Sequence, residues 1–213
     1  MTTLVVGAHG KIGQRLCERA VSEGLSVRAL VRNEEQQNEL ARTGVETVIG
    51  DLEGDLAHAF EGCDEVVFTA GSGPHTGADK TLMIDLNGAW RCVEYAEALN
   101  MKRFIMVSTL HREPLDGPDA LVPYLAAKRA ADYRVTASTV PHVLVRPGRL
   151  TDDRGTGHYS IAVTEENGGR TSRDNVAEAI VHLLGTPVTD ALDLPLLDGD
   201  TPWSELEKSL SHG

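Results

Sequence analysis

The stretch Leu4-Val5-Val6-Gly7-Ala8-His9-Gly10-Lys11-Ile12-Gly13 decides the fold, because a short apolar run breaks into three glycines and then into a helical pattern. Gly7 permits a tight turn, Gly10 lets an anion approach the backbone, and Gly13 lets the helix pack closely on the sheet. The spacing G-x-x-G-x-x-G predicts a strand-turn-helix whose free N–H groups bind a dinucleotide, although the glycines could form only a turn. The expected contacts are Gly7, His9, Gly10, Lys11, Ile12 and Gly13.

Length and charge exclude several classes of protein. A chain of 213 residues with a formal charge of −12 is expected to form one domain over residues 1–213. The acidic balance argues against a nucleic-acid partner, because such binding depends on clustered Lys and Arg. No secretory leader and no stretch of about 18 apolar residues is found. We therefore expect no membrane partner and a cytoplasmic location.

The cysteines and histidines do not form a recognisable metal-binding pattern. Cys17, Cys63 and Cys92 lie far apart without a C-x-x-C pair, so we expect reduced and mostly buried thiols. The histidines are scattered without ligand spacing, which predicts no metal site. His111 lies three residues after Ser108 and is the histidine that we expect near a substrate pocket.

Apolar runs alternate with helical patterns along most of the chain. Strands are expected over 27–31, 46–49, 65–69, 103–107, 142–145 and 192–197. Helices are expected over 33–42, 56–60, 80–99 and 203–210, with a further one after Ser172 or Thr171 as cap. This alternation predicts an α/β fold of the Rossmann type, a doubly wound parallel sheet with helices on both faces. Small C-terminal elements over about 149–170 and 190–211 are expected to cover the substrate.

Arg32 and Asn33 directly follow the strand expected at 27–31 and are candidate cofactor contacts. At this place an acidic side chain binds the ribose hydroxyls of NAD, whereas an arginine pairs with the 2′-phosphate of NADP. No Asp or Glu occurs at 31–33, so the motif favours NADP(H), with NAD(H) as the alternative. The competing interpretation is that Arg32 is an exposed cation paired with the two glutamates that follow it.

Other strand ends supply further candidate contacts to the cofactor. Asp51 and Leu52 follow the strand at 46–49 and are candidates for adenine, although Asp51 could instead cap the next helix. Ala70 and Gly71 open a glycine-rich loop over 70–77, where small residues let a dinucleotide pass. Pro147 is expected to end the sixth strand, because it has no N–H to donate, and to flank the nicotinamide.

Tyr124 and Lys128 are the pair most indicative of chemistry. Their spacing of four places both on one helix face. A tyrosine hydroxyl has a pKa near 10 and needs a nearby cation to act on protons at neutral pH, which Lys128 could supply. Ser108, at the end of the strand over 103–107, could orient a substrate carbonyl.

With these residues the sequence resembles the short-chain dehydrogenase/reductase superfamily, and more narrowly its atypical NAD(P)-binding branch near the epimerase/dehydratase and biliverdin or flavin reductase types. The residues that carry the resemblance are Gly7–Gly13, Val107-Ser108-Thr109, Tyr124–Lys128, Val145-Arg146-Pro147-Gly148 and Ser172–Ala177. The resemblance implies that Ser108 orients a carbonyl, Tyr124 transfers a proton and Lys128 binds ribose. The resemblance also implies a fourth catalytic residue, an asparagine in most of the superfamily; Asp85 stands where this branch often has Asp, with Asn87 as the alternative.

These observations predict an NADP(H)-dependent oxidoreductase that moves hydride to or from a small carbonyl, alcohol or conjugated substrate. One alternative is an NADP(H)-binding regulator that senses redox state without catalysis. A second alternative is epimerase or dehydratase chemistry. The sequence does not distinguish a monomer from a homodimer.

Overall fold

The computed structural model describes residues 1–73, 76–110, 121–186 and 191–210, and His111 lies outside these ranges. Its centre is a nine-stranded sheet, counted over the described residues, in the order β11-β8-β10-β6-β5-β4-β1-β2-β3. The parallel strands are β1 (Thr2–Val6), β2 (Ser26–Val31), β3 (Glu46–Ile49), β4 (Glu65–Phe68), β5 (Arg103–Val107), β6 (His142–Pro147) and β10 (Leu192–Asp198). The predicted doubly wound parallel sheet is thereby confirmed.

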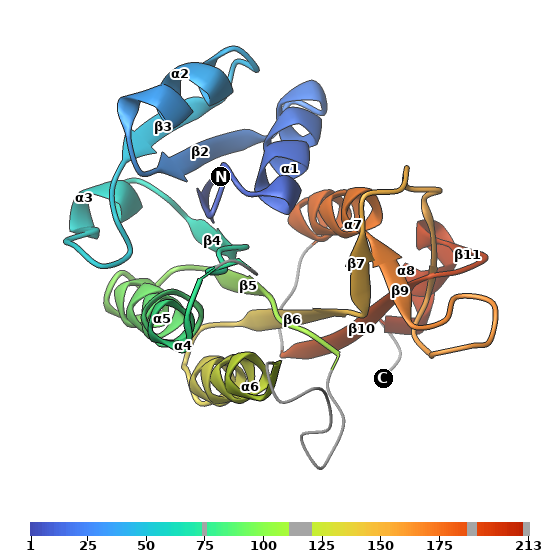
Figure 1. Cartoon of the computed structure of the whole chain (residues 1–213). Helices are drawn as coiled ribbons and strands as arrows, with labels where there is room; N and C mark the ends of the chain where they lie inside the picture. The colour runs from blue at the N-terminus through green and yellow to red at the C-terminus, as the bar shows by residue number, and fades with distance from the viewer. Residues whose placement is uncertain (74–75, 111–120, 187–190, 211–213) are drawn as a thin grey trace.

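Helices cover both faces of this sheet (Figure 1). The helices are α1 (Lys11–Ser22), α2 (Glu34–Ala41), α3 (Ala57–Phe60), α4 (Ala78–Lys80), α5 (Ala89–Ala98), α6 (Val122–Thr136), α7 (Arg173–Gly185), α8 (Trp203–Leu210) and the π-helix η1 (Thr81–Gly88). Strand β1 shows how the two layers arise, since Val5 packs into one apolar cluster with α1 and α7 while Leu4 and Val6 pack into the other with α5. None of the described helices has the length and apolarity that a membrane crossing requires.

The C-terminal third adds short strands beside the parallel sheet. Strand β7 (Arg149–Thr151) pairs in parallel with β9 (Arg170–Ser172) as a separate two-stranded sheet. Strands β8 (His158–Ser160) and β11 (Thr201–Pro202) extend the main sheet in antiparallel fashion beyond β10. These are the small elements expected over 149–170 and 190–211. Ser172, rather than Thr171, caps α7 by accepting a hydrogen bond from the N–H of Asn175.

One sequence expectation is confirmed and one is wrong in detail. Pro147 is the last residue of β6, as expected, in register with Leu196, and its carbonyl still accepts a hydrogen bond from the N–H of Leu110 at 2.8 Å. A proline loses only its donor, so its acceptor remains usable. The helix expected over 80–99 is divided into α4, η1 and α5. Apolar periodicity predicts a helix there but does not reveal the wider π-turn.

The glycine turn is packed so closely that glycine is sterically required at two of its positions, Gly7 and Gly13. A Cβ built on Gly13 would lie 2.3 Å from the carbonyl oxygen of Gly7, and one built on Gly7 would lie 2.5 Å from the nitrogen of Ala70. Gly7 also has φ of +84°, a conformation that favours glycine. The start of α1 and the end of β4 therefore lie directly against this turn.

We predict that Gly13→Ala lowers the free energy of unfolding by about 1–3 kcal/mol, the usual cost of forcing atoms into a packed region. Urea denaturation of the two proteins measures the difference. Gly185→Ala is the control, because a Cβ there would meet nothing within 4 Å. Equal stability changes in the two variants would contradict the steric account.

Candidate active site

The turn between β1 and α1 has the geometry of an anion site. Gly10 is the extended N-cap of α1 and offers no side chain to cap the helix. The first N–H groups of an α-helix have no partner within the helix, so those of α1 are left for a ligand. Ile12 is buried and Lys11 exposed, so only the backbone of Ile12 is open to a ligand. The turn therefore fits the pyrophosphate of a dinucleotide.

The residues that follow β4 form the next part of the site, beside the glycine turn. The hydroxyl of Thr69 donates to the carbonyl oxygens of Val6 and Gly7 at 3.1 and 3.2 Å, which ties the ends of β1 and β4 together. Ala70 and Gly71 follow directly. A Cβ on Gly71 would lie 3.1 Å from Oδ1 of Asp85, so this segment fits closely against η1.

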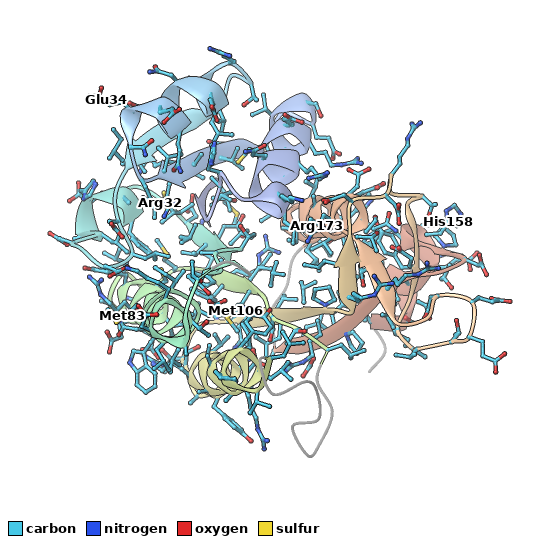
Figure 2. All side chains as sticks on the ribbon, viewed as in Figure 1. Arg32, Glu34, Met83, Met106, His158 and Arg173 are labelled. Atoms are coloured by element: carbon cyan, nitrogen blue, oxygen red, sulfur yellow. The ribbon has the colours of Figure 1, made fainter. Side chains whose placement is uncertain are left out.

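Arg32 lies exposed at the end of β2 (Figure 2). Its backbone N–H donates to the side chain of Gln36, and Asn33 caps α2 by accepting from the N–H of Gln36. Among the ion pairs of the described ranges none includes the Arg32 guanidinium, so the expected alternative of a pair with Glu34 or Glu35 is not found. The guanidinium of Arg32 is therefore available to a ligand at the carboxyl end of β2.

His9 and the two adenine candidates have partners within the protein. Nε2 of His9 lies 2.6 Å from Oε2 of Glu39 on α2. Oδ1 of Asp51 accepts from the N–H of Glu53 in the same loop, whereas Asp55 accepts from the first N–H of α3. The alternative that Asp51 caps the next helix is therefore wrong. Leu52 is buried against Gly88 of η1, with 3.3 Å to a Cβ built there.

A group of buried charges lies beyond the carboxyl end of β5. Nζ of Lys128 is buried and donates to the carbonyl oxygen of Val107 at 2.7 Å. The carboxylate of Asp85, 1% exposed, accepts from the N–H of Ser72 at 2.9 Å and thereby holds the loop after β4. Asp85 and Asp132 raise the pKa of Lys128, while burial, the larger effect, lowers it.

Arg146 and Asp132 complete this group and were not among the residues predicted for the site. Nη1 of Arg146 donates to Oδ2 of Asp132 and lies 3.4 Å from the hydroxyl of Ser108. Asp132 is one helical turn after Lys128 on α6. The signals in the sequence are the four-residue spacing of Asp132 from Lys128 and the place of Arg146 in the Val145-Arg146-Pro147-Gly148 motif that carries the resemblance.

Tyr124 faces the same two carboxylates as Lys128. Burial, followed by the charges of Asp85 and Asp132, raises the pKa of the Tyr124 hydroxyl to about 12. The shift is opposite to the lowering of this pKa that was expected from Lys128. The reasons are the burial of Tyr124, the two carboxylates near both side chains, and the direction of the Lys128 ammonium toward the carbonyl of Val107. Tyr124 is therefore held in its protonated form at neutral pH.

A hollow of about 400 Å³ lies among the C-terminal elements. Its lining is polar and includes Asp153, Ser160, Asn167, Arg170 and Asp200. Ser108, Tyr124 and Lys128 are not part of this lining, so the hollow is separate from the group of buried charges. In the part of the chain that the structure describes, no cluster of side chains has the composition of a metal site.

The chain is similar to a known protein family and to named proteins. The model of an NAD(P)H-binding family matches residues 7–187. The chain is 42% identical over 215 residues to a Bacillus subtilis protein named uncharacterized sugar epimerase YhfK, covering 99% of this chain and 100% of that protein.

Two solved structures are similar along most of their length. One, from Bacillus halodurans, is provisionally named an NAD-dependent epimerase/dehydratase; it is 41% identical with a TM-score of 0.90 and coverage of 99% and 100%. The other is ChuY of Escherichia coli O157:H7, named an anaerobillin reductase, which is 25% identical with a TM-score of 0.77 and coverage of 94% and 98%.

We predict that Arg32→Ala weakens binding of NADPH by about tenfold or more and leaves NADH nearly unchanged, because a charge-assisted contact to the 2′-phosphate contributes roughly 1.5–3 kcal/mol. Isothermal titration calorimetry at fixed ionic strength measures both affinities. Arg42→Ala removes another exposed arginine, just after α2, and serves as the control. Equal loss for both nucleotides, or loss in the control, would contradict this role.

Proposed function

The chain belongs to the NAD(P)H-binding family, and on that premise we propose that it is an NADPH-dependent reductase of the short-chain dehydrogenase/reductase type. Its substrate is a small molecule with a carbonyl or conjugated double bond. The observation that supports this proposal is that Tyr124 and the buried Lys128 lie near the same two carboxylates, with the Lys128 ammonium on the carbonyl of Val107, the residue before Ser108.

Each side chain has a distinct role in this proposal. The hydroxyl of Ser108 donates a hydrogen bond to the substrate oxygen and orients it. Tyr124 donates its proton to that oxygen as the reduction proceeds. Lys128 binds the nicotinamide ribose, and Asp85 keeps the loop at 70–72 in place through the N–H of Ser72. The bound NADPH supplies the hydride.

The protonation state of Tyr124 favours reduction over oxidation. Oxidation of an alcohol, or the first step of epimerisation, needs a group that accepts a proton. A tyrosine with a pKa near 12 is almost entirely protonated at neutral pH and is a poor acceptor. It remains a suitable donor to a developing alkoxide, whose conjugate acid is weaker still.

Epimerase chemistry is the second candidate, and the similarity to YhfK over 99% of the chain favours it. An epimerase returns its hydride to the product, so it consumes no NADPH in net terms. A reductase oxidises one NADPH for each substrate molecule. Absorbance at 340 nm with small carbonyls, quinones and flavins therefore separates the two candidates.

We predict that Tyr124→Phe lowers turnover by roughly 10²–10⁴, the usual effect of losing a general acid, while NADPH affinity changes little. Tyr133→Phe is the matched control, because Tyr133 lies on the same helix and is 62% exposed. Steady-state rates and calorimetric affinities are measured for both. Full activity of the Tyr124 variant would remove this residue from the mechanism. NADPH binding by a wild-type protein without turnover would favour the redox-sensing regulator.

We also predict that the alkaline loss of activity follows Lys128 and not Tyr124. The pKa of Lys128 is lowered from its ordinary 10.5 by burial, whereas that of Tyr124 is raised to about 12. As pH rises, the ammonium therefore loses its proton first. Turnover as a function of pH should fall below pH 10.5 in the wild-type protein. A profile that stays level to about pH 12 would contradict this order.

A further inference from the structure

Three cations surround the carboxylate of Asp152, which follows β7. Nζ of Lys11 lies 2.6 Å from it and Nη1 of Arg173 lies 2.9 Å from it. Arg15 is more distant, at 3.9 Å. Lys11 begins α1 and Arg173 begins α7, so residues from three separate parts of the chain meet here.

Lys11 and Arg173 occupy positions that helix electrostatics disfavour. The N-terminus of a helix carries a partial positive charge, and a cation there is unfavourable by some tenths of a kcal/mol. The first turn of α1 contains no acidic residue, and Asp174 in the first turn of α7 pairs with Arg19. Residues that break a local rule are expected at functional sites, where a ligand compensates for them.

The arrangement of the helices brings these cations to the glycine turn. Helices α1 and α7 lie side by side, and Arg173 lies beside the start of α1 and near β7 (Figures 1 and 2). Gly10 immediately precedes Lys11. An anion bound at the first N–H groups of α1 is therefore next to Lys11, which shares Asp152 with Arg173.

Resting on the dinucleotide binding of the proposed function, we propose that Arg173 binds the cofactor pyrophosphate together with Lys11, and that Asp152 is the counter-ion of both. An arginine suits this role because its planar guanidinium binds phosphate oxygens in pairs. The backbone at the start of α7 is already engaged, since Asp198 accepts from the N–H of Ser172 and Ser172 from that of Asn175. The side chain of Arg173 is therefore the contribution of α7.

The overall charge makes local cations necessary. A protein with a formal charge of −12 repels a dinucleotide that itself carries several negative charges. The Asp152 carboxylate offsets one of the nearby positive charges. Removing that carboxylate should strengthen the local field for an anion, whereas removing Arg173 should weaken it.

The test compares three nucleotides by isothermal titration calorimetry: NADPH, ADP and adenosine 2′-monophosphate. ADP carries the pyrophosphate without the 2′-phosphate, and adenosine 2′-monophosphate carries the reverse. We expect Arg173→Gln to weaken NADPH and ADP by about tenfold and to leave adenosine 2′-monophosphate unchanged. Arg173→Lys, which keeps the charge, should retain much of the affinity. Asp152→Asn should tighten NADPH and ADP by roughly threefold or more.

Arg19→Gln is the matched control, because Arg19 joins the same two helices through Asp174 but does not contact Asp152. It should leave all three affinities unchanged. Thermal unfolding of every variant shows whether a change in affinity reflects loss of the fold. An Arg173→Gln protein that binds ADP like the wild type, or weakens all three nucleotides equally, would overturn the assignment. So would an Asp152→Asn protein that binds ADP no more tightly than the wild type.

A failure of the proposed function would give a different result from a failure of the Arg173 assignment. A wild-type protein that binds neither NADPH nor ADP would defeat dinucleotide binding as a whole. A wild-type protein that binds both, with an Arg173→Gln variant that does so equally well, would defeat only the role of Arg173.

Discussion

The backbone of α1 lies against the backbone of the turn that precedes it, and the other parts of the site depend on this contact. A side chain on Gly13 would collide with Gly7, and a side chain on Gly7 would collide with Ala70. The close fit brings the ends of β1 and β4 together and leaves the first N–H groups of α1 facing outward. The same geometry packs α1 on the sheet and leaves the start of this helix without a side-chain cap, as a phosphate-binding turn requires.

The remainder of the site is a cluster of charged side chains of both signs. Lys128, Asp85, Asp132 and Arg146 are brought together from α6, η1 and β6, and positive and negative groups are balanced in number. Removing one member of a buried ion pair lowers the stability of a protein by about 3–5 kcal/mol. Each of these charged residues therefore depends on its oppositely charged neighbours. Tyr124 lies among them as a protonated group, which fits a donor. Exposed cations at the glycine turn and at Arg32 counter the negative charge of the whole chain.

Much of the fold follows from local patterns in the sequence. The strands over 46–49 and 103–107 and the helix over 203–210 lie where apolar spacing predicted them. Local patterns do not show which residues from distant segments come into contact. Arg146 meets Asp132, and Arg173 meets Asp152, only because the sheet and α7 bring them together. For the same reason the expected direction of the Tyr124 pKa shift was wrong. Burial, which depends on distant segments, raises this pKa most, and the charge of Asp85 from the π-helix η1 adds to it.

The most direct measurement is a titration of the wild-type protein with NADPH and with NADH at matched ionic strength, followed by quenching of the fluorescence of Trp90 and Trp203. The account predicts that both nucleotides bind at the glycine turn and that NADPH binds more tightly, because Arg32 is available for its 2′-phosphate. Tighter binding of NADH, or no binding of either nucleotide, would contradict it.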